Sequence, residues 1–342
     1  MFKHILVPLD GSERAERALS VAAQIARSTG GSVVLLRVVS TSVEYWPYMA
    51  PQPTLTQTII DADLEDAAKY LAGVTARSEL RGISTETMAL YGPAAATILS
   101  TAYSHDIDLI LLCSHGYTGV TRWIMGSIAE KVARHAAIPV LILREGGPIP
   151  VGAHPDGRLF RVLVPLDGSA RAKAALEPAA DLVSTLADAG QGALHLVRVV
   201  RLHEGDLGVV QMPQEGSEPE LGVQKAKKYL SSTLEHIREG LTADVVKEHN
   251  LTITWSVALD SDVASAIIRV AENGEDVEGV GVAGGCDVIA MATHGYGGLQ
   301  HWAMGSVTER VLNATKLPVL IVRPAEMVDK SHLHTKTVAV HQ

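Results

Sequence analysis

The chain contains two copies of one pattern, and this internal repeat constrains its fold more than any other feature. The segment Ile5–Ser12, Ile-Leu-Val-Pro-Leu-Asp-Gly-Ser, recurs as Val162–Ser169 with a single change. Further segments recur in the same order: Leu36–Val39 returns as Val197–Val200, Met125–Ser127 as Met304–Ser306, and Pro139–Ile142 as Pro318–Ile321. Since repeats of this length can each bury a core, we expect two domains, at 1–145 and 158–325.

Within the first copy, short apolar runs alternate with segments of helical periodicity. The pattern predicts strands over Ile5–Leu9, Ser32–Val39, Thr85–Leu90, Leu109–Cys113 and Val140–Leu143, and helices over Glu13–Thr29, Asp63–Leu80, Ala94–His105 and Ser127–Ala137. Such alternation builds an α/β fold with a parallel, doubly wound sheet, whose ligands bind at the carboxyl ends of the strands. The closing strands Val140–Leu143 and Val319–Val322 would be apolar edges, and their antiparallel pairing would join the two sheets.

Charge and composition narrow the classes of partner. A net charge of −9 argues against nucleic acid, whose phosphates need a basic surface. Acidic residues gather in His203–Glu220 and Glu272–Glu278, which we interpret as solvated loops rather than docking sites. No apolar run approaches the ~18–20 residues that span a bilayer, and Cys113 and Cys286 are too few for a disulfide framework. We therefore expect a cytoplasmic protein with neither a membrane nor a nucleic-acid partner.

The first candidate site follows the first strand of each copy. Asp10 and Asp167 stand where a parallel strand ends, on the rim of the expected ligand crevice. A carboxylate there can accept hydrogen bonds from ribose hydroxyls or hold a metal. It can equally close an Asx turn, with Ser12 capping the next helix. The sequence leaves both interpretations open.

The second candidate is a repeated pattern of two glycines and a serine, Gly-x9-Gly-Ser, which spans Gly116–Ser127 and Gly295–Ser306. Each serine precedes a glutamate by three residues, which matches a capping box at a helix start. A helix N-terminus exposes unpaired N–H groups and a partial positive charge, and glycines let an anion approach the backbone. A capped helix alone would not need the upstream glycine, so the pattern favours a phosphate site.

Taken together, these motifs resemble the universal stress protein family. The shared set is Pro-x-Asp-Gly-Ser after the first strand, a small residue with Ser/Thr-His-Gly after the fourth, Gly-Ser at the last helix, and a closing Pro-Val-Leu-Ile. The resemblance implies two five-stranded domains of the adenine-nucleotide alpha-hydrolase-like type, packed as a pseudo-twofold tandem within one chain. It also implies binding of ATP, with or without magnesium, and a role in stress response or signalling. A further homodimer is left open, and no metal ligand is identified.

The resemblance also assigns roles to individual residues. Asp10 and Asp167 would meet the ribose or a metal, and the backbone of Val38 and Val199 would meet the adenine edge. The phosphates would lie beside Ser114, Gly116, Gly126 and Ser127 in the first copy, and beside Thr293, Gly295, Gly305 and Ser306 in the second. The family's motif is G-x2-G-x9-G-[S/T]. Both copies in this chain depart from it at the first glycine, where one copy has Cys113 and the other has Ala292. If the backbone closes on the ligand there, the second site should be the tighter one.

Other functions lack their motifs. The sequence contains no P-loop G-x4-G-K-[S/T], no dinucleotide G-x-G-x-x-G after a strand and no G-x-S-x-G of a serine hydrolase. No general base or transition-state arginine stands out for fast phosphoryl transfer. We therefore expect nucleotide binding rather than rapid turnover, with slow hydrolysis left open. The alternative is a nucleotide-free interaction scaffold, in which Cys113 and Ala292 mark decayed sites.

Three further residue types have structural interpretations. His115 and His294 each follow a hydroxyl residue, but neighbours in a strand point to opposite faces, so a nucleophile–base pair is not predicted. Trp123 and Trp302 precede each Gly-Ser, where packing between the halves is favoured over contact with a cofactor. Cys113 ends a buried strand and is expected to be an inert thiol.

Overall fold

The computed structural model describes residues 2–40, 53–114, 125–151, 154, 156–202, 218–240, 242–274, 285–293 and 304–324. For residues 53–56 it describes the backbone only. Several predicted features lie outside these described residues: His115, Gly116, Trp123, His294, Gly295, Trp302 and most of the two acidic segments.

Each half alternates strands and helices as the sequence predicts. The first half contains β1 (His4–Leu9), α1 (Glu13–Glu16), α2 (Ala18–Thr29), β2 (Ser32–Val39), α3 (Pro53–Thr75), a 3-10 turn (Ser78–Leu80), β3 (Ser84–Tyr91), α4 (Ala94–Ser104), β4 (Leu109–Cys113), α5 (Ser127–His135) and β5 (Val140–Leu143). The second contains β6 (Phe160–Pro165), α6 (Ala170–Lys173), α7 (Leu176–Leu186), β7 (Gly192–Arg201), α8 (Glu218–Glu239), α9 (Ala243–Glu248), β8 (Thr252–Asp260), α10 (Val263–Asn273), β9 (Val288–Ala292), α11 (Ser306–Ala314) and β10 (Val319–Val322). None of the helices in the described ranges is long and apolar enough to cross a membrane.

The predicted strands of the first half are confirmed to within one residue at each end, whereas three helices differ. The helix expected over Glu13–Thr29 is divided at Arg17, whose guanidinium donates to the backbone carbonyls of Arg144 and Gly147. The second half divides at the matching place, so the break belongs to the repeat. The helix expected from Asp63 is α3, which begins ten residues earlier and ends at Thr75. Helix α5 ends at His135, and the next residue, Ala136, is already extended, with φ −61° and ψ 136°.

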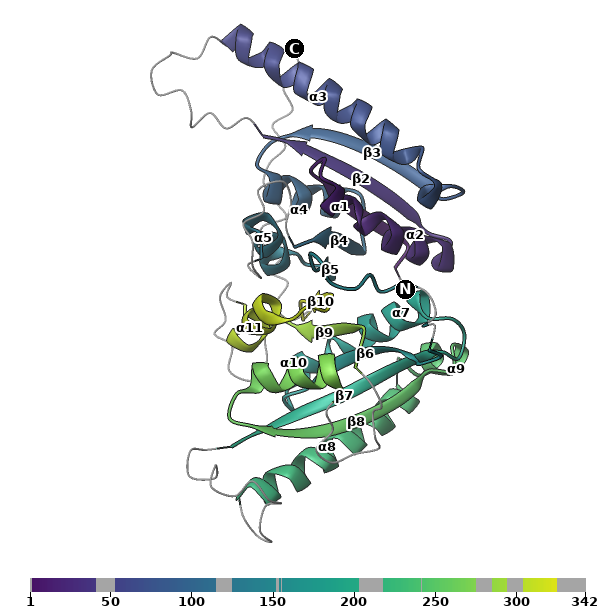
Figure 1. The fold of residues 1–342 in the computed structure, drawn as a ribbon, viewed down its shortest axis with the longest axis vertical. Coiled ribbons are helices and arrows are strands. Elements are labelled where there is room, and N and C mark those ends of the chain that lie inside the picture. Colours follow the sequence, from purple (N-terminus) through teal and green to yellow (C-terminus); the bar gives the residue numbers. More distant parts are fainter. Residues whose placement is uncertain are drawn as a thin grey trace.

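All ten strands form one sheet, in the order β3-β2-β1-β4-β5-β10-β9-β6-β7-β8 (Figure 1). Strands within each half are parallel, and the two closing strands β5 and β10 pair antiparallel at the centre. The predicted α/β fold and the predicted joining of two five-stranded sheets into a pseudo-twofold unit are both confirmed.

The helices cover this sheet in two layers, each with its own apolar core. Residues of α1, α2, α3, α6, α7, α8 and α9 pack on one face. Residues of α4, α5, α10 and α11 pack on the other. Because both faces are covered, the central strands are buried through their middles, as the fully buried run Ile5–Val7 shows, whereas the edge strand β3 contains no buried residue. The strand ends are therefore where a ligand can reach the central strands.

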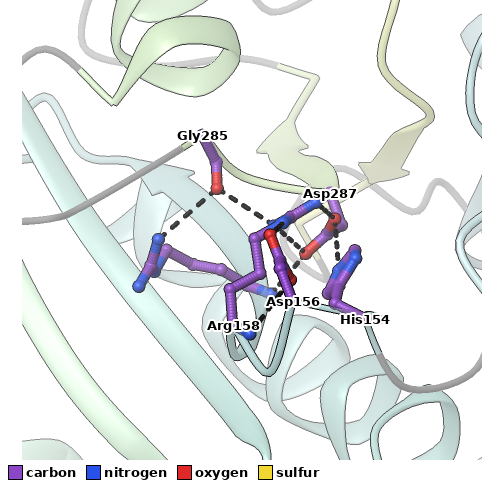
Figure 2. Close-up of polar contacts among 6 residues, drawn as sticks. His154, Asp156, Arg158, Gly285 and Asp287 are labelled. Atoms are coloured by element: carbon purple, nitrogen blue, oxygen red, sulfur yellow. Dashed lines mark hydrogen bonds and ion pairs between the residues drawn. The ribbon is translucent and has the colours of Figure 1, made fainter.

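An aspartate fastens the amino ends of two strands in each half. Asp108, just before β4, accepts hydrogen bonds from two backbone N–H groups at the start of β1. Its counterpart Asp287, before β9, accepts from the N–H of Arg161 (2.7 Å) and pairs with the guanidinium of Arg158 at 2.6 Å. The Nε2 atom of His154 lies 2.9 Å from the same carboxylate (Figure 2). The segment between the halves is thus fixed to the second half.

Two arginines that follow the closing strands cross the seam between the halves. Arg144 donates from Nε to the carbonyl oxygen of Thr315 (3.1 Å), the C-cap residue of α11. Arg323 donates from Nη1 to the carbonyl oxygen of His135 (3.5 Å), the last residue of α5. Cations are favoured at helix C-termini, where carbonyl groups carry partial negative charge. Each half therefore caps the last helix of the other.

Candidate functional site

A cavity of about 690 Å³ opens at the carboxyl ends of β1, β2 and β4 in the first half. The chain leaves β1 toward the face covered by α1 and α2, and leaves β4 toward the face covered by α5. Adjacent strands whose connections run to opposite faces create a crevice, which is where open α/β sheets bind their ligands.

The site residues predicted in the first half converge on this cavity. Its wall includes Asp10 after β1, Val38 in β2, Cys113 and Ser114 at the end of β4, and Gly126 and Ser127 at the start of α5. These residues come from four separate elements, so the fold and not local sequence brings them together. Of the predicted first-half set, only Gly116 lies outside the described residues.

The Asx turn, one of the two interpretations of Asp10, is present. Oδ1 of Asp10 accepts from the N–H (3.0 Å) and the hydroxyl (2.6 Å) of Ser12, and the Ser12 oxygen accepts from the N–H of Ala15 as the N-cap of α1. Oδ1 of Asp167 accepts in the same way from the N–H of Ser169 (2.9 Å). The turn fixes the carboxylate of Asp10 on the cavity wall and is compatible with its contact to a ligand.

The backbone conformation of this loop favours glycine, and an arginine side chain lies close to it. Gly11 and Gly168 have φ angles of +84° and +94°, which side-chain-bearing residues rarely adopt. A Cβ atom at these positions would lie 3.1 Å from Nη1 of Arg37 and 3.0 Å from Nη1 of Arg198, respectively. Arg37 also lines the cavity, and its guanidinium lies over the ring of Tyr70. Sequence reasoning missed these arginines, although their identical places in the repeated second strand are the signal that could have found them.

The capping-box interpretation of the Gly-Ser motif is wrong. The N-cap of α5 is Gly126, and Ser127 is the first helical residue, so the serine does not occupy the capping position. Gly126 donates its N–H to the carbonyl of Ser114 (2.7 Å) and accepts from the N–H of Glu130 (2.9 Å), so the helix starts one residue earlier than a serine cap requires. The Glu130 carboxylate instead pairs with Arg134 at 2.6 Å. The hydroxyl of Ser127 is therefore not used to cap its own helix.

The second half repeats this backbone frame. Gly305 is the N-cap of α11 and donates to the carbonyl of Thr293 (2.8 Å), and Thr293 donates to that of Val322 (2.9 Å). Ser306 is the first helical residue, so the capping box is wrong here as well. The remaining predicted residues lie at matching strand ends: Asp167 after β6, Val199 in β7, and Ala292 as the last residue of β9. One difference is Thr308, whose hydroxyl donates to the carbonyl of Ala292 (3.0 Å) and ties α11 to β9.

Cys113 is held toward the α1 side of the sheet. Its Sγ lies 3.9 Å from the carbonyl oxygen of Ala15, and the side chain packs against the core on that face. Burial raises the pKa of the Cys113 thiol to about 12, so the group stays protonated at neutral pH. A protonated thiol fits the expectation that Cys113 is inert. Because Cys113 and Ala15 both line the cavity, the sulfur lies at the cavity wall as well as against the core.

Comparison with known proteins covers both halves of the chain. The model of the Universal stress protein family matches residues 1–144 and 159–323. The chain belongs to the universal stress protein family. Universal stress protein Rv2005c of Mycobacterium tuberculosis is 23% identical over 327 residues, which cover 93% of this chain and 96% of that protein. Universal stress protein MJ0531 of Methanocaldococcus jannaschii is 30% identical over 146 residues, 42% of this chain and 84% of its own length.

A solved structure supports the fold over the whole tandem. The crystal structure of a universal stress protein from Archaeoglobus fulgidus matches with a TM-score of 0.59 at 20% identity, and the match covers 94% of this chain and 98% of that one. At this identity the likeness concerns the fold alone.

Proposed function

We propose that this universal stress protein binds an adenine nucleotide, ATP, in the first-half cavity, and that the bound nucleotide serves stress response or signalling. The observation that carries the proposal is the convergence of Asp10, Val38, Ser114, Gly126 and Ser127 on one cavity at the switch point of the sheet. Its volume of about 690 Å³ falls within the range of small-molecule sites, roughly 300–1,000 Å³.

The helix start on the cavity wall suits the phosphates. The first N–H groups of a helix lack intrahelical acceptors, and the macrodipole places partial positive charge there. Ser127 opens α5 with an exposed side chain that does not cap the helix. Its hydroxyl and the free N–H groups of the first turn are therefore suited to donate to phosphate oxygens.

The other end of the nucleotide would meet the strand ends. The Asp10 carboxylate would accept from ribose hydroxyls, and the Val38 backbone would bond the adenine edge. Mg²⁺ usually binds through phosphates, water and one or two carboxylates. Asp10, Asp63 and Asp66 are carboxylates on the cavity wall, so the wall is chemically compatible with magnesium carried by ATP. The phosphates of ATP would supply the negative charge that the N-terminus of α5 favours.

The same proposal extends to the organisation of the chain. We assign two domains, 1–145 and 158–325, and a second nucleotide site at the matching residues Asp167, Val199, Thr293, Gly305 and Ser306. The described cysteines Cys113 and Cys286 are free, which suits a reducing cytoplasm. The net charge of −9 supports leaving nucleic acid out of the proposed partners.

Nucleotide that co-purifies with the protein tests the proposal directly. The protein is denatured, and the released small molecules are separated by chromatography and counted per chain. The proposal predicts adenine nucleotide in a fixed ratio to protein, and calorimetric binding of ATP in preference to GTP after the ligand is stripped. The scaffold alternative predicts neither released nucleotide nor heat of ATP binding.

A further inference from the structure

One repeated tyrosine has a different charge environment in each half. Tyr70 in α3 and Tyr229 in α8 hold matching positions beside the arginine of the second strand. The Cζ atom of Arg37 lies 5.8 Å from the centroid of the Tyr70 ring, and that of Arg198 lies 4.8 Å from the Tyr229 ring. Both halves thus place a guanidinium over an aromatic ring, next to the Asp-Gly-Ser loop.

In the first half, an acid completes this arrangement. The hydroxyl of Tyr70 donates to Oε1 of Glu16 (2.8 Å), and Oε2 of Glu16 pairs with Arg77 at 2.5 Å. The side chain of Glu16 is only 8% exposed, so this carboxylate occupies the space beside the ring and satisfies the phenol.

In the second half, the residue that matches Glu16 is Lys173. Its Nζ lies 5.2 Å from the centroid of the Tyr229 ring, so two cations share one ring. Within the described ranges neither Lys173 nor Arg198 has an ion-pair partner, and the phenol oxygen of Tyr229 is buried with no hydrogen-bond partner. The hydroxyl of Thr233 donates instead to the backbone carbonyl of Tyr229 (2.9 Å).

This combination of two cations and an unpaired phenol suits an anion. Two half-buried cations repel each other, and a buried unpaired hydroxyl costs free energy. The nearby carboxylate of Asp167 lies at the exposed rim of the loop, where its Oδ1 accepts from Ser169. A small oxyanion would neutralise both cations and accept from the phenol.

We propose that Lys173, Arg198 and the hydroxyl of Tyr229 form an anion-binding subsite in the second half, and that it takes a phosphate group. Guanidinium and ammonium groups are the usual ligands of phosphate oxygens in proteins. Burial raises the pKa of Tyr229, so the phenol remains protonated and can donate. The first half lacks this subsite, because Glu16 fills the position with a negative charge.

Titration of inorganic phosphate into the full chain, followed by calorimetry, tests the subsite. The change Lys173→Glu installs the first-half residue and should weaken phosphate binding by at least about tenfold, since it removes one charge-assisted contact and adds repulsion. It should leave the melting temperature unchanged or higher, because the new carboxylate can accept from Tyr229 as Glu16 does from Tyr70. Lys228→Glu makes the same charge change at an exposed position of α8 and is the matched control.

Tyr229→Phe separates binding from structure. Removal of a buried, unpaired hydroxyl should not lower the melting temperature, but it should weaken phosphate binding. The proposal is overturned if phosphate gives no saturable binding to the unmodified chain, or if Lys173→Glu and Lys228→Glu weaken binding equally.

Free phosphate and a nucleotide-borne phosphate share this chemistry, and a competition experiment distinguishes them. ATP that displaces bound inorganic phosphate indicates that the subsite holds part of a nucleotide, whereas independent binding of both indicates a separate oxyanion site. The subsite does not depend on the proposed first-half nucleotide site. The difference in phosphate binding between Lys173→Glu and Lys228→Glu should therefore be the same in a Gly126→Val background.

Discussion

Leu141 of β5 faces Leu320 of β10 across the antiparallel seam at the centre of the sheet, and both side chains are completely buried. Because each leucine contributes to the core that the other half also uses, the two halves should unfold as one cooperative unit.

Lysine at Leu141 tests this cooperativity. Leu141→Lys should lower the free energy of unfolding by at least about 3 kcal/mol, since it buries an unpaired charge in the core. Urea denaturation followed by circular dichroism measures the loss, and Ile59→Lys, at a position 48% exposed, serves as the control with little effect. Separate unfolding transitions for the two halves of the unmodified chain would contradict the account.

Arg144 and Arg323, which cross the seam between the halves, should contribute unequally to the free energy of unfolding. Arg144 is 3% exposed and bonds Thr315 at 3.1 Å, whereas Arg323 is more exposed and its bond to His135 is longer. Arg144→Ala should therefore cost about 2 kcal/mol of unfolding free energy through the lost helix cap and packing. Arg323→Ala should cost clearly less. If Arg144→Ala and Arg323→Ala lose the same unfolding free energy in this assay, burial does not determine how much each arginine stabilises the seam.

A buried histidine predicts acid sensitivity. His195 in β7 is 1% exposed, and its ring nitrogens lie 2.8 Å from the Thr254 hydroxyl and 2.9 Å from the Ser256 hydroxyl. Burial, with a smaller contribution from the charge of Arg161, lowers the pKa of His195 from 6.5 to about 4.

The direction of this pH effect follows from the different pKa of His195 in the folded and the unfolded chain. Between pH 6.5 and 4 the unfolded chain binds a proton at His195 that the folded chain does not, so stability falls as the pH falls. The loss at His195 should reach about 3 kcal/mol. His195→Gln should be less stable at pH 7 but should lose less on acidification, in unfolding measured at several pH values. Identical pH dependence in both proteins would show that His195 is not the group responsible.

The thiol at the first glycine of the nucleotide motif should not control affinity. Because Cys113 packs toward Ala15 of α1, Cys113→Gly should change ATP affinity by less than about twofold while it destabilises the strand by about 1 kcal/mol. Since its pKa is about 12, the thiol should also resist alkylation near neutral pH in the folded chain. A large gain in ATP affinity in Cys113→Gly would instead restore the interpretation in which the sulfur obstructs the first site.

Much of the fold could be predicted from the sequence, because buried parallel strands appear as apolar runs. The repeat shows the same order of these runs in both halves. The same reasoning located Asp10, Ser114 and Ser127 correctly at strand and helix ends. The helix cap was predicted wrongly, because the choice between Gly126 and Ser127 depends on a bond to Ser114 that the chain makes only after it folds back.

Long-range pairing explains the remaining omissions. The sequence shows Glu16 replaced by Lys173 in the second copy, but the change acquires meaning only when α8 brings Tyr229 beside it. From the sequence alone, Arg37 is an ordinary strand residue. Its role appears only in the fold, where its guanidinium lies over Tyr70 and beside Gly11.

Calorimetric titration of ATP into the stripped protein and its Gly126→Val variant tests the central claim most directly. Gly126 has φ −62° and ψ 145°, a conformation that valine adopts without strain, so the fold should be retained. The valine side chain would enter the cavity wall at the helix start and should abolish binding at the first site, while Gly305→Val affects only the second. Unchanged stoichiometry and affinity in a folded Gly126→Val protein would show that the nucleotide does not bind at this helix start.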